Sequence, residues 1–391
     1  MGSMRLAECL GYVGESVFRK IGMKLKIILF VIMGLSVINC YAGESYVLQR
    51  MYGFPSQEAG YEKGVSACFA GHIGGTLLIA GGCNFPEKPA CEGGRKKYYN
   101  GIYAAATGDS DQLLWRKVGE LPTASAYGVS VSWRDQVVMV GGNNERGSLN
   151  AVYTITLKDN GAVVSNLPSL PVAMDNMTGC LVDNLLYVAG GNVEGQPSRK
   201  VYYMDLASAV KEWHALPDLP GDVRVQPVSG MADKGVFCVW GGFRPKSKLE
   251  DAALSFDGWA YDVIARTWRH LTSPVDTEGS EVFLGGGTAV NLGTETVIAV
   301  GGVNKEVFLS ALNHPQPGYM IHEPEWYKFN PLVLAYRDGS WSVLGNEKPA
   351  ARAGAAFVSV SDDIYIIGGE LKPGIRTADI FRLRFSFERL Q

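Results

Sequence analysis

Short apolar runs that end in a pair of glycines recur along this chain. The six pairs are Gly81-Gly82, Gly141-Gly142, Gly190-Gly191, Gly241-Gly242, Gly301-Gly302 and Gly368-Gly369, and their first glycines lie 49 to 67 residues apart. The apolar runs predict strands over Thr76–Ala80, Gln136–Val140, Leu185–Ala189, Val236–Trp240, Thr296–Val300 and Asp363–Ile367. A repeat of this length with several strands in each unit is typical of a β-propeller.

Each unit fits one four-stranded blade. A strand of small residues precedes the glycine strand, for example in 128–132 and 354–358, and small side chains suit an innermost strand near a crowded axis. An outer strand with a tryptophan closes most units; these residues are Trp115, Trp213, Trp268 and Trp341. We expect the tryptophans to pack between blades. The sequence therefore predicts an all-β fold, a six-bladed propeller.

The two ends of the repeat region predict how the ring closes. The last unit nearly stops after 377–385, whereas 46–51 has no partner in its own unit. We expect this N-terminal strand to complete the last blade, because that pairs two open sheet edges. The propeller would then span 46–386, and no amphipathic helical pattern is found after residue 43.

Composition agrees with an ordinary globular protein. The 391 residues are 47% hydrophobic and 19% charged, with a formal net charge of −3. This balance argues against a basic nucleic-acid surface, so no nucleic-acid partner is expected. The 48 glycines and 18 prolines agree with a turn-rich, all-β chain.

The N-terminal region predicts export. A short basic segment, the apolar run 27–38 and small residues up to Ala42 make 23–42 a secretory signal peptide, and the mature chain is expected in a bacterial periplasm. Lipidation at Cys40 is the alternative. A membrane helix fits less well, because the run is shorter than the ~20 residues that a span needs. Residues 1–22 are an upstream leader or extension.

Export implies an oxidising compartment, in which disulfides form. Cys83 and Cys91 bracket a short loop and could pair. The alternative is that all the cysteines beyond the signal are unpaired. Cys68, Cys180 and Cys238 lie in apolar strands and are expected to be small core residues. The scattered histidines and cysteines predict no metal site.

The loops after the glycine pairs carry the candidate site. They are long in 83–99, 243–256 and 303–329, whereas the links between first and second strands are short, so one face of the ring is elaborated. A polar side chain follows each glycine pair; these are Asn84, Asn143, Asn192, Arg244, Asn304 and Glu370. We expect them to meet at one mouth of the central channel.

Such a ring of side chains suits a polyhydroxylated, anionic ligand. An amide both donates and accepts hydrogen bonds, as sugar hydroxyls require, and arginine can bind a carboxylate through two bonds. The alternative is that each asparagine only supports its own turn, because Asn tolerates the left-handed conformation. Arg224 and Arg352 lie in loops on the same face and are candidates for anion binding, or else solvated loop cations.

Glu370 is the exception, because most other units have Asn at this place. Arg376 follows across a Pro-Gly turn and could keep Glu370 ionised or bind an acid group of the ligand. A carboxylate that is partly removed from water suits general acid–base catalysis. The alternative is a surface ion pair worth at most ~1 kcal/mol.

The stretch 368–377 reads Gly-Gly-Glu-Leu-Lys-Pro-Gly-Ile-Arg-Thr. It resembles the Gly-Glu-x-Lys-Pro-Gly-x-Arg-Thr stretch of the bacterial N-acetylneuraminate epimerases, or sialic acid mutarotases, which are built from kelch repeats. Further matching pieces lie at 119–121, 126–130 and 301–304. The resemblance covers nearly all of 46–386 but in rotated order, because the Glu/Arg blade is central in those enzymes and last here. The chain is therefore similar to a cyclically permuted branch of the family.

The resemblance implies a function. Members of the family interconvert the α and β anomers of sialic acid in the periplasm without a metal or organic cofactor. Their proposed catalytic pair falls on Glu370 and Arg376, and Tyr127, in a matching piece, is a candidate for substrate binding. A non-catalytic propeller that binds glycans or a protein partner is the competing interpretation, which the fold alone does not separate. A copper oxidase is disfavoured by the scattered histidines.

Overall fold

The computed structural model describes residues 45–159, 161–233 and 235–386. The predicted signal peptide at 23–42, the lipidation alternative at Cys40 and the leader at 1–22 lie outside this part of the chain. Within it, none of the helices is both long enough and apolar enough to cross a membrane.

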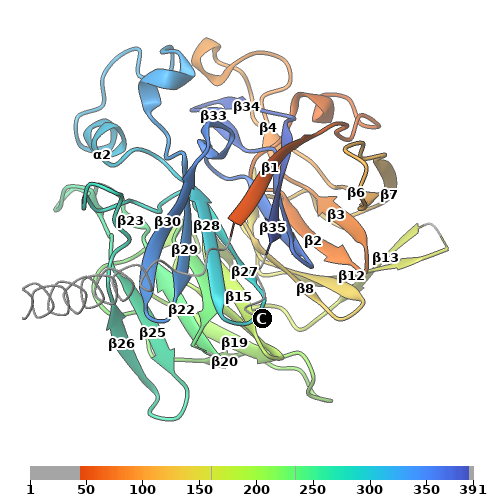
Figure 1. Ribbon diagram of the computed structural model, residues 1–391, viewed down its shortest axis with the longest axis horizontal. Helices are drawn as coiled ribbons and strands as arrows, with labels where there is room; N and C mark the ends of the chain where they lie inside the picture. Colours follow the sequence, from red (N-terminus) through yellow and green to blue (C-terminus); the bar gives the residue numbers. More distant parts are fainter. Residues whose placement is uncertain (1–44, 160, 234, 387–391) are drawn as a thin grey trace, which may run out of the picture. The chain divides into compact units, whose positions relative to one another are not determined.

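Six four-stranded antiparallel sheets form the blades of a ring (Figure 1), and they are numbered here in chain order. Blade 1 contains β2 (Phe69–Ile73), β3 (Thr76–Ala80), β6 (Gly101–Ala106) and β7 (Arg116–Glu120). Blade 2 contains β8 (Val129–Trp133), β9 (Gln136–Val140), β12 (Val152–Lys158) and β13 (Gly161–Asn166). Blade 3 contains β15 (Thr178–Val182), β16 (Leu185–Ala189), β19 (Val201–Asp205) and β20 (His214–Ala215).

The second half of the ring repeats this order. Blade 4 contains β21 (Val228–Ala232), β22 (Val236–Trp240), β25 (Gly258–Asp262) and β26 (Thr267–Leu271). Blade 5 contains β27 (Gly287–Leu292), β28 (Thr296–Gly301), β29 (Leu332–Arg337) and β30 (Ser340–Asn346). Blade 6 contains β31 (Ala356–Val360), β32 (Asp363–Ile367), β35 (Ile380–Ser386) and β1 (Ser45–Met51). The predicted glycine strands match the second strand of each blade to within one residue.

The innermost strands close the ring. Strands β2, β8, β15, β21, β27 and β31 contact one another in this order, and β31 contacts β2 again. Side chains bridge these strands: Ser130 Oγ accepts a hydrogen bond from the Ala70 N–H at 2.8 Å, and Asn291 Oδ1 accepts one from the Met231 N–H at 2.8 Å. The prediction of a six-bladed propeller is confirmed.

Small residues in the innermost strands allow the blades to approach each other closely. A Cβ atom on Gly71 would lie 2.7 Å from the side chain of Val137 in the next blade. A Cβ atom on Gly230 would lie 2.6 Å from the side chain of Val297, again in the next blade. Interiors are packed too densely to absorb such overlaps without a shift, so these glycines allow the inner strands to sit close to the axis.

The outer tryptophans join neighbouring blades, as predicted. The indole N–H of Trp213, next to β20 in blade 3, donates to the Pro168 carbonyl after blade 2 at 2.9 Å. The indole N–H of Trp268, in blade 4, donates to the Pro217 carbonyl after blade 3 at 3.1 Å. These two indoles thus satisfy their one polar group while their rings cover the seam between two sheets.

Short hairpins and helices lie in the loops that connect the strands of the blades. The hairpin strands are β4 (Cys83–Asn84) and β5 (Lys97–Tyr98), β10 (Asn143–Asn144) and β11 (Gly147–Ser148), β14 (Met174–Asp175), β17 (Asn192–Val193) and β18 (Gln196–Pro197), β23 (Phe243–Arg244) and β24 (Ala253–Leu254), and β33 (Glu370–Lys372) and β34 (Ile375–Arg376). The helices are α2 (Lys305–Asn313) and the 3₁₀ turns η1 (Tyr61–Lys63), η2 (Ala90–Glu92), η3 (Pro324–Tyr327) and η4 (Lys348–Ala350). Figure 1 shows β4, β33 and β34 near the top of the view and α2 at its upper left.

Helix α2 was not expected from the sequence. It lies in the long loop of blade 5, and the Asn304 side chain caps its N-terminus by accepting a hydrogen bond from the Val307 N–H at 3.0 Å. None of its nine residues is buried. The helix therefore lacks the fully buried apolar stripe from which a helix is recognised in sequence.

Strand β1 completes blade 6, as the ends of the repeat region predicted; the sheet order is β1-β35-β32-β31. Arg382 of β35 is 1% exposed and connects three parts of the ring at this closure. It donates to Gln49 Oε1 of β1 at 2.5 Å and to the Gly108 carbonyl of blade 1 at 2.7 Å. It also lies 3.5 Å from Asp363 Oδ2 of its own blade.

Replacing Arg382 with leucine should lower the free energy of unfolding by about 3 kcal/mol, because the buried guanidinium that joins β1, blade 1 and Asp363 is then lost. Arg384, two residues further along β35, has a side chain that is 44% exposed and pairs with Asp363. Arg384→Leu should therefore cost at most about 1 kcal/mol. Equilibrium urea unfolding followed by tryptophan fluorescence measures both, and equal losses would contradict the closure role of Arg382.

Candidate active site

A closed ring of backbone hydrogen bonds surrounds one mouth of the central channel. Each blade contributes one residue just before its innermost strand, and this residue donates its N–H to the carbonyl of its counterpart in the preceding blade. The six residues are Ala67, Tyr127, Asn176, Gln226, Gly286 and Gly354, with N···O distances of 2.7 to 3.2 Å. All six have positive φ angles, between 52° and 72°. Residues with side chains rarely adopt this conformation, so the ring constrains the sequence in every blade.

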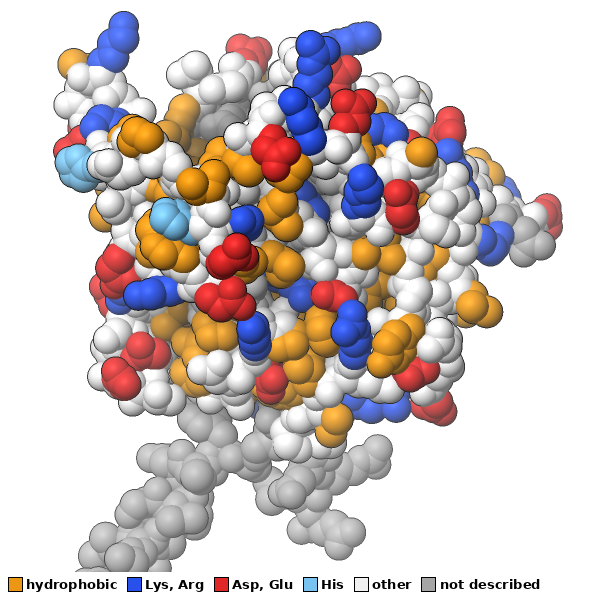
Figure 2. Space-filling view, turned by 90° about the horizontal axis from the view of Figure 1, so that it is seen from above, with side chains coloured by type: hydrophobic (Ala, Val, Ile, Leu, Met, Phe, Trp, Pro, Cys, Tyr) orange, Lys and Arg blue, Asp and Glu red, His pale blue; other side chains and the backbone are white. Residues whose placement is uncertain are grey.

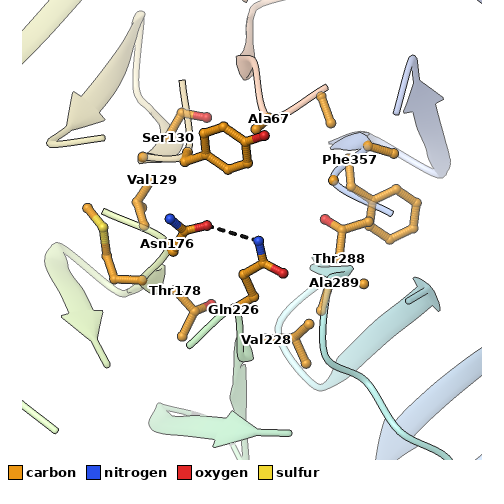
Figure 3. Close-up of a pocket in the computed structure, with 18 of the residues that line it drawn as sticks. Ala67, Val129, Ser130, Asn176, Thr178, Gln226, Val228, Thr288, Ala289 and Phe357 are labelled. Atoms are coloured by element: carbon orange, nitrogen blue, oxygen red, sulfur yellow. Dashed lines mark hydrogen bonds between the residues drawn. The ribbon is translucent and has the colours of Figure 1, made fainter. Parts of the chain in front are cut away.

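The side chains of this ring cover half of the mouth. Blades 2, 3 and 4 contribute Tyr127, Asn176 and Gln226, whereas blades 5, 6 and 1 contribute two glycines and an alanine. The three polar side chains line a cavity of about 200 Å³ at the channel axis (Figure 3). The half without large side chains includes blade 6, which carries Glu370.

A tight turn and a hairpin place Glu370 beside Arg376. Gly368 and Gly369 turn the chain out of β32 with φ angles of 63° and 98°, and a Cβ atom on Gly368 would lie 2.5 Å from the Val65 carbonyl oxygen. In the hairpin of β33 and β34, Glu370 pairs directly with Arg376. Arg376 Nη1 lies 2.9 Å from Glu370 Oε1, and the Gly374 N–H donates to the same oxygen at 2.8 Å.

The two members of this pair differ in their access to solvent. The Arg376 side chain is 4% exposed, whereas that of Glu370 is 24% exposed. Arg376 Nε donates to Ser66 Oγ at 3.1 Å, and its guanidinium lies over the Phe85 ring at 4.8 Å. Burial by itself would lower the pKa of Arg376, but Glu370, Tyr127 and Cys83 together act more strongly in the opposite direction and the pKa is raised. A buried cation thus supports a carboxylate that a ligand can reach, unlike a solvated surface pair.

Tyr127 belongs to the other half of the mouth, but it lies close enough to Arg376 and Glu370 to interact with both electrostatically. Its hydroxyl is 3.5 Å from Cys83 Sγ and 3.5 Å from Lys96 Nζ. Burial, with a contribution from Cys83, raises the pKa of Tyr127 well above its usual range, and Arg376 acts in the opposite direction. The hydroxyl is therefore protonated at neutral pH and can donate a hydrogen bond. Seen from above (Figure 2), charged side chains of both signs lie among apolar ones on this face.

The six polar residues that follow the glycine pairs do not form one set. Asn143, Asn192 and Glu370 come first after their glycines, whereas Asn84, Arg244 and Asn304 come second. Successive side chains of an extended strand point in opposite directions. The expectation that all six converge on the mouth is therefore wrong, because the first positions of blades 1, 4 and 5 are Cys83, Phe243 and Val303.

The second-position residues have structural partners of their own. Asn84 is 2% exposed; it donates to the Gly60 and Gly64 carbonyls at 2.7 and 2.8 Å and accepts from the Tyr99 hydroxyl. Asn304 caps α2. Arg244 lies between two carboxylates, 3.3 Å from Asp222 and 2.6 Å from Glu250. These contacts fix loops, so the side chains are engaged away from a ligand at the mouth.

Arg224 and Arg352 are buried side chains that stabilise loops, rather than exposed cations. Arg224 is 2% exposed and donates to the Gly241 carbonyl and to Asp257. Arg352 is 3% exposed and donates to the Gly368 carbonyl at 2.6 Å. Burial lowers the pKa of Arg352 to about 10. Both residues support the carbonyls of glycine turns in their own blades, which corrects the expectation that they face an anionic ligand.

The disulfide considered for Cys83 and Cys91 is absent. Both residues are free, as are Cys68, Cys180 and Cys238. Cys83 is buried in β4 with its thiol facing Ser66 and Tyr127, whereas Cys91 is exposed in η2. The loop that they bracket therefore directs the two side chains into different environments. Among the described residues, no three or more His, Cys, Asp or Glu side chains are grouped so that they could hold a metal ion.

A buried network that the sequence did not predict lies across the mouth. Asp175 is 3% exposed, and it accepts hydrogen bonds from Ser148 Oγ at 2.5 Å, Asn176 Nδ2 at 2.5 Å and Asn192 Nδ2 at 2.8 Å. Asn176 Oδ1 in turn accepts from Gln226 Nε2 at 2.9 Å. The signal was present in the repeat, because aligning the blades on Tyr127 places Asn176 and Gln226 at the same position.

Comparison with known proteins gives one consistent family. The family model described as "NANM: N-acetylneuraminate epimerase" matches residues 40–164 and 167–391. An N-acetylneuraminate epimerase of Salmonella typhi is 29% identical over 240 residues, which is 58% of this chain and 60% of the relative. One of Haemophilus influenzae strain PittEE is 29% identical over 233 residues, which is 57% of this chain and 60% of the relative.

The match with individual relatives is partial. The chain spans about 60% of the length of these curated relatives. The solved structure of the protein YjhT is 27% identical with a TM-score of 0.49, and the match covers 57% of this chain and 66% of that one. The family model, in contrast, extends over most of the chain in its two segments. The chain belongs to the N-acetylneuraminate epimerase family.

Proposed function

We propose that this protein interconverts the α and β anomers of N-acetylneuraminic acid or a closely related acidic sugar. The observation that carries the proposal is the Glu370–Arg376 pair, in which a buried guanidinium holds a reachable carboxylate at the channel mouth. The family and the names of the relatives support the choice of substrate. We further propose that the protein acts in the periplasm, which the apolar segment before Ala42 supports.

The chemistry of mutarotation fits one carboxyl group. Glu370 takes the proton of the anomeric hydroxyl, and the electrons of that O–H bond form the carbonyl as the bond from the anomeric carbon to the ring oxygen breaks. The ring oxygen gains a proton, which gives the open-chain ketone. Rotation next to the carbonyl presents its other face, and the same steps in reverse close the ring as the other anomer.

Both proton transfers can use the same side chain. The anomeric hydroxyl and the ring oxygen are bonded to one carbon, so a carboxyl group that takes a proton from the first can deliver it to the second. The number of protons is conserved, and the sequence of steps requires no cofactor. Arg376 and Gly374 engage Glu370 Oε1, whereas no described residue hydrogen-bonds Oε2, so we assign the transfers to Oε2.

The surroundings of Glu370 suit an acidic sugar. Lys96 brings an exposed cation to the Tyr127 hydroxyl, and its ammonium lies 5.2 Å from the centre of the Tyr127 ring. A substrate carboxylate near this ammonium would be attracted to it, and the protonated Tyr127 hydroxyl can donate to a sugar oxygen. Arg376 is too buried for a large share of substrate contact, so its main role in the proposal is to orient Glu370 and balance its charge.

Glu370→Gln should lower the rate of anomer equilibration at least about 100-fold, because an amide cannot accept the proton. The rate is measured by proton NMR, starting from one anomer. Glu250→Gln is the matched control, since Glu250 is a 59% exposed partner of Arg244. Acceleration that is equal for the wild type and Glu370→Gln would move the proton transfers to another group. A folded wild type that binds the sugar without acceleration would support the non-catalytic interpretation.

Arg376→Lys should keep the positive charge but lose the planar guanidinium that pairs with Glu370 and also donates to Ser66. We expect kcat to fall about tenfold, the effect of roughly 1.4 kcal/mol on the barrier, with a smaller change in KM. Arg244→Lys, at another arginine–glutamate pair of this face, should leave both constants within about twofold of the wild type. A rise in KM with unchanged kcat would instead identify Arg376 as a ligand of the substrate carboxylate.

A further inference from the structure

The buried carboxylate of Asp175 fixes the direction of the hydrogen bonds across the mouth. The amide nitrogens of Asn176 and Asn192 face this carboxylate and donate to one of its oxygens. The two contacts are 2.5 and 2.8 Å long, and Ser148 donates to the other carboxylate oxygen. The carbonyl oxygen of the Asn176 side chain must therefore point away from Asp175, along the ring.

The orientation of the Asn176 amide determines the orientation of the Gln226 amide. Asn176 Oδ1 can only accept, so Gln226 offers it the amide nitrogen, at 2.9 Å. The remaining polar atom of Gln226 is its carbonyl oxygen, Oε1, and no described residue donates to it. Figure 3 shows the side chain between Asn176 and Thr288 with this oxygen directed into the cavity. The network thus presents one oriented hydrogen-bond acceptor inside the mouth.

The place of this acceptor relative to Glu370 follows from the ring. Gln226 belongs to blade 4 and Glu370 to blade 6, and the ring residue of the blade between them is Gly286. A Cβ atom on Gly286 would lie 3.5 Å from Gln226 Oε1 and 3.7 Å from Ala353 Cβ. Ala353 is the backbone partner of Glu370, since its N–H donates to the Glu370 carbonyl. Val303 Cγ1 would lie 3.8 Å from the same Cβ atom on Gly286, so the path over Gly286 from Gln226 towards the Glu370 strand is bordered by the apolar side chains of Ala353 and Val303.

The wall next to the acceptor has an apolar part, although Thr178 and Thr288 also line it. Val228 and Ala289 line the same cavity and are seen beside Gln226 in Figure 3, and Met177 and Phe357 line it further round. A group that suits this place has a hydrogen-bond donor followed by a small apolar end. A secondary amide with a short acyl chain has both, whereas a plain hydroxyl has only the donor.

We propose that Gln226 Oε1 accepts a hydrogen bond from the N–H of the substrate's acylamino group, whose methyl end packs against the apolar part of the wall. Asp175 and Asn176 act as positioning residues that hold the Gln226 amide in this orientation. The proposal rests on the proposed function, because it assumes that the reacting end of the sugar lies at Glu370. It makes this cavity a determinant of specificity for N-acylated acidic sugars.

The test variant is Gln226→Gly. Gln226 has a φ angle of 52°, and the equivalent positions of blades 5 and 6 are glycines, so the backbone ring accepts this replacement. Ser361→Gly is the matched control, since Ser361 also has a positive φ angle, of 55°, but is exposed in a short link between first and second strands. Two substrates are compared, N-acetylneuraminic acid and the analogue in which hydrogen replaces the acylamino group.

We expect Gln226→Gly to raise KM for N-acetylneuraminic acid about five- to tenfold, the usual effect of one lost hydrogen bond. The kcat, and the KM for the analogue, should stay within about twofold of the wild type, as should all constants of Ser361→Gly. KM values that rise equally for both substrates, or for neither, would overturn the acylamino assignment. Calorimetric titration with N-acetylneuraminic acid gives the same comparison as Kd values.

The titration also separates the two proposals. A wild type that binds the sugar but does not accelerate its equilibration would refute the mutarotase, while a five- to tenfold weaker Kd for Gln226→Gly would still support the subsite. A wild type that accelerates equilibration, with an unchanged KM in Gln226→Gly, would refute the subsite alone. A wild type that neither binds nor accelerates would refute both.

Discussion

Six backbone hydrogen bonds around the channel mouth are the constraint on which the rest of this structure depends. Each bond joins a left-handed residue of one blade to its counterpart in the next, from Ala67 round to Gly354 and back. The inner strands of neighbouring blades belong to separate sheets, so this ring gives a continuous backbone linkage from blade to blade. Because the backbone N–H groups of the ring are used within it, a ligand at the mouth is bound by side chains, both those of the ring and those of the hairpins around it.

The backbone hydrogen bond of the ring recurs in all six blades, but the side chains at the mouth differ from blade to blade. Tyr127, Asn176 and Gln226 fill one half of the mouth, and the small residues of blades 5, 6 and 1 leave the other half clear. Glu370 and Arg376 occupy the clear half, with the cation buried and the anion reachable. A few side chains thus make the two halves of a nearly symmetric ring different. Because of this difference, the Glu370 carboxylate and the Gln226 acceptor can bind two ends of one ligand.

Buried polar groups hold this arrangement in place. Arg224 and Arg352 bind the carbonyls of glycine turns, and Arg382 joins β1, blade 6 and blade 1 at the closure. Asp175 accepts hydrogen bonds from three side chains and so fixes the orientation of the amide groups at the mouth. Charged groups of this kind are stable inside a protein only with such partners, which is why they serve as fixed points rather than as ligands for solvent or substrate.

The sequence alone determined the six blades, their glycine strands, the inter-blade tryptophans, the closure by β1 and the pairing of Glu370 with Arg376, because each of them follows from the repeat pattern or from one short stretch of the chain. Only the tertiary structure decided which polar residues face the mouth. Strand alternation turns Asn84, Arg244 and Asn304 away from the mouth, and burial makes Arg224 and Arg352 structural residues. The hydrogen bond that links the Asp175 network to Gln226 joins residues 50 positions apart in the sequence. Those outcomes depend on how six blades meet, and no single stretch of the chain contains that information.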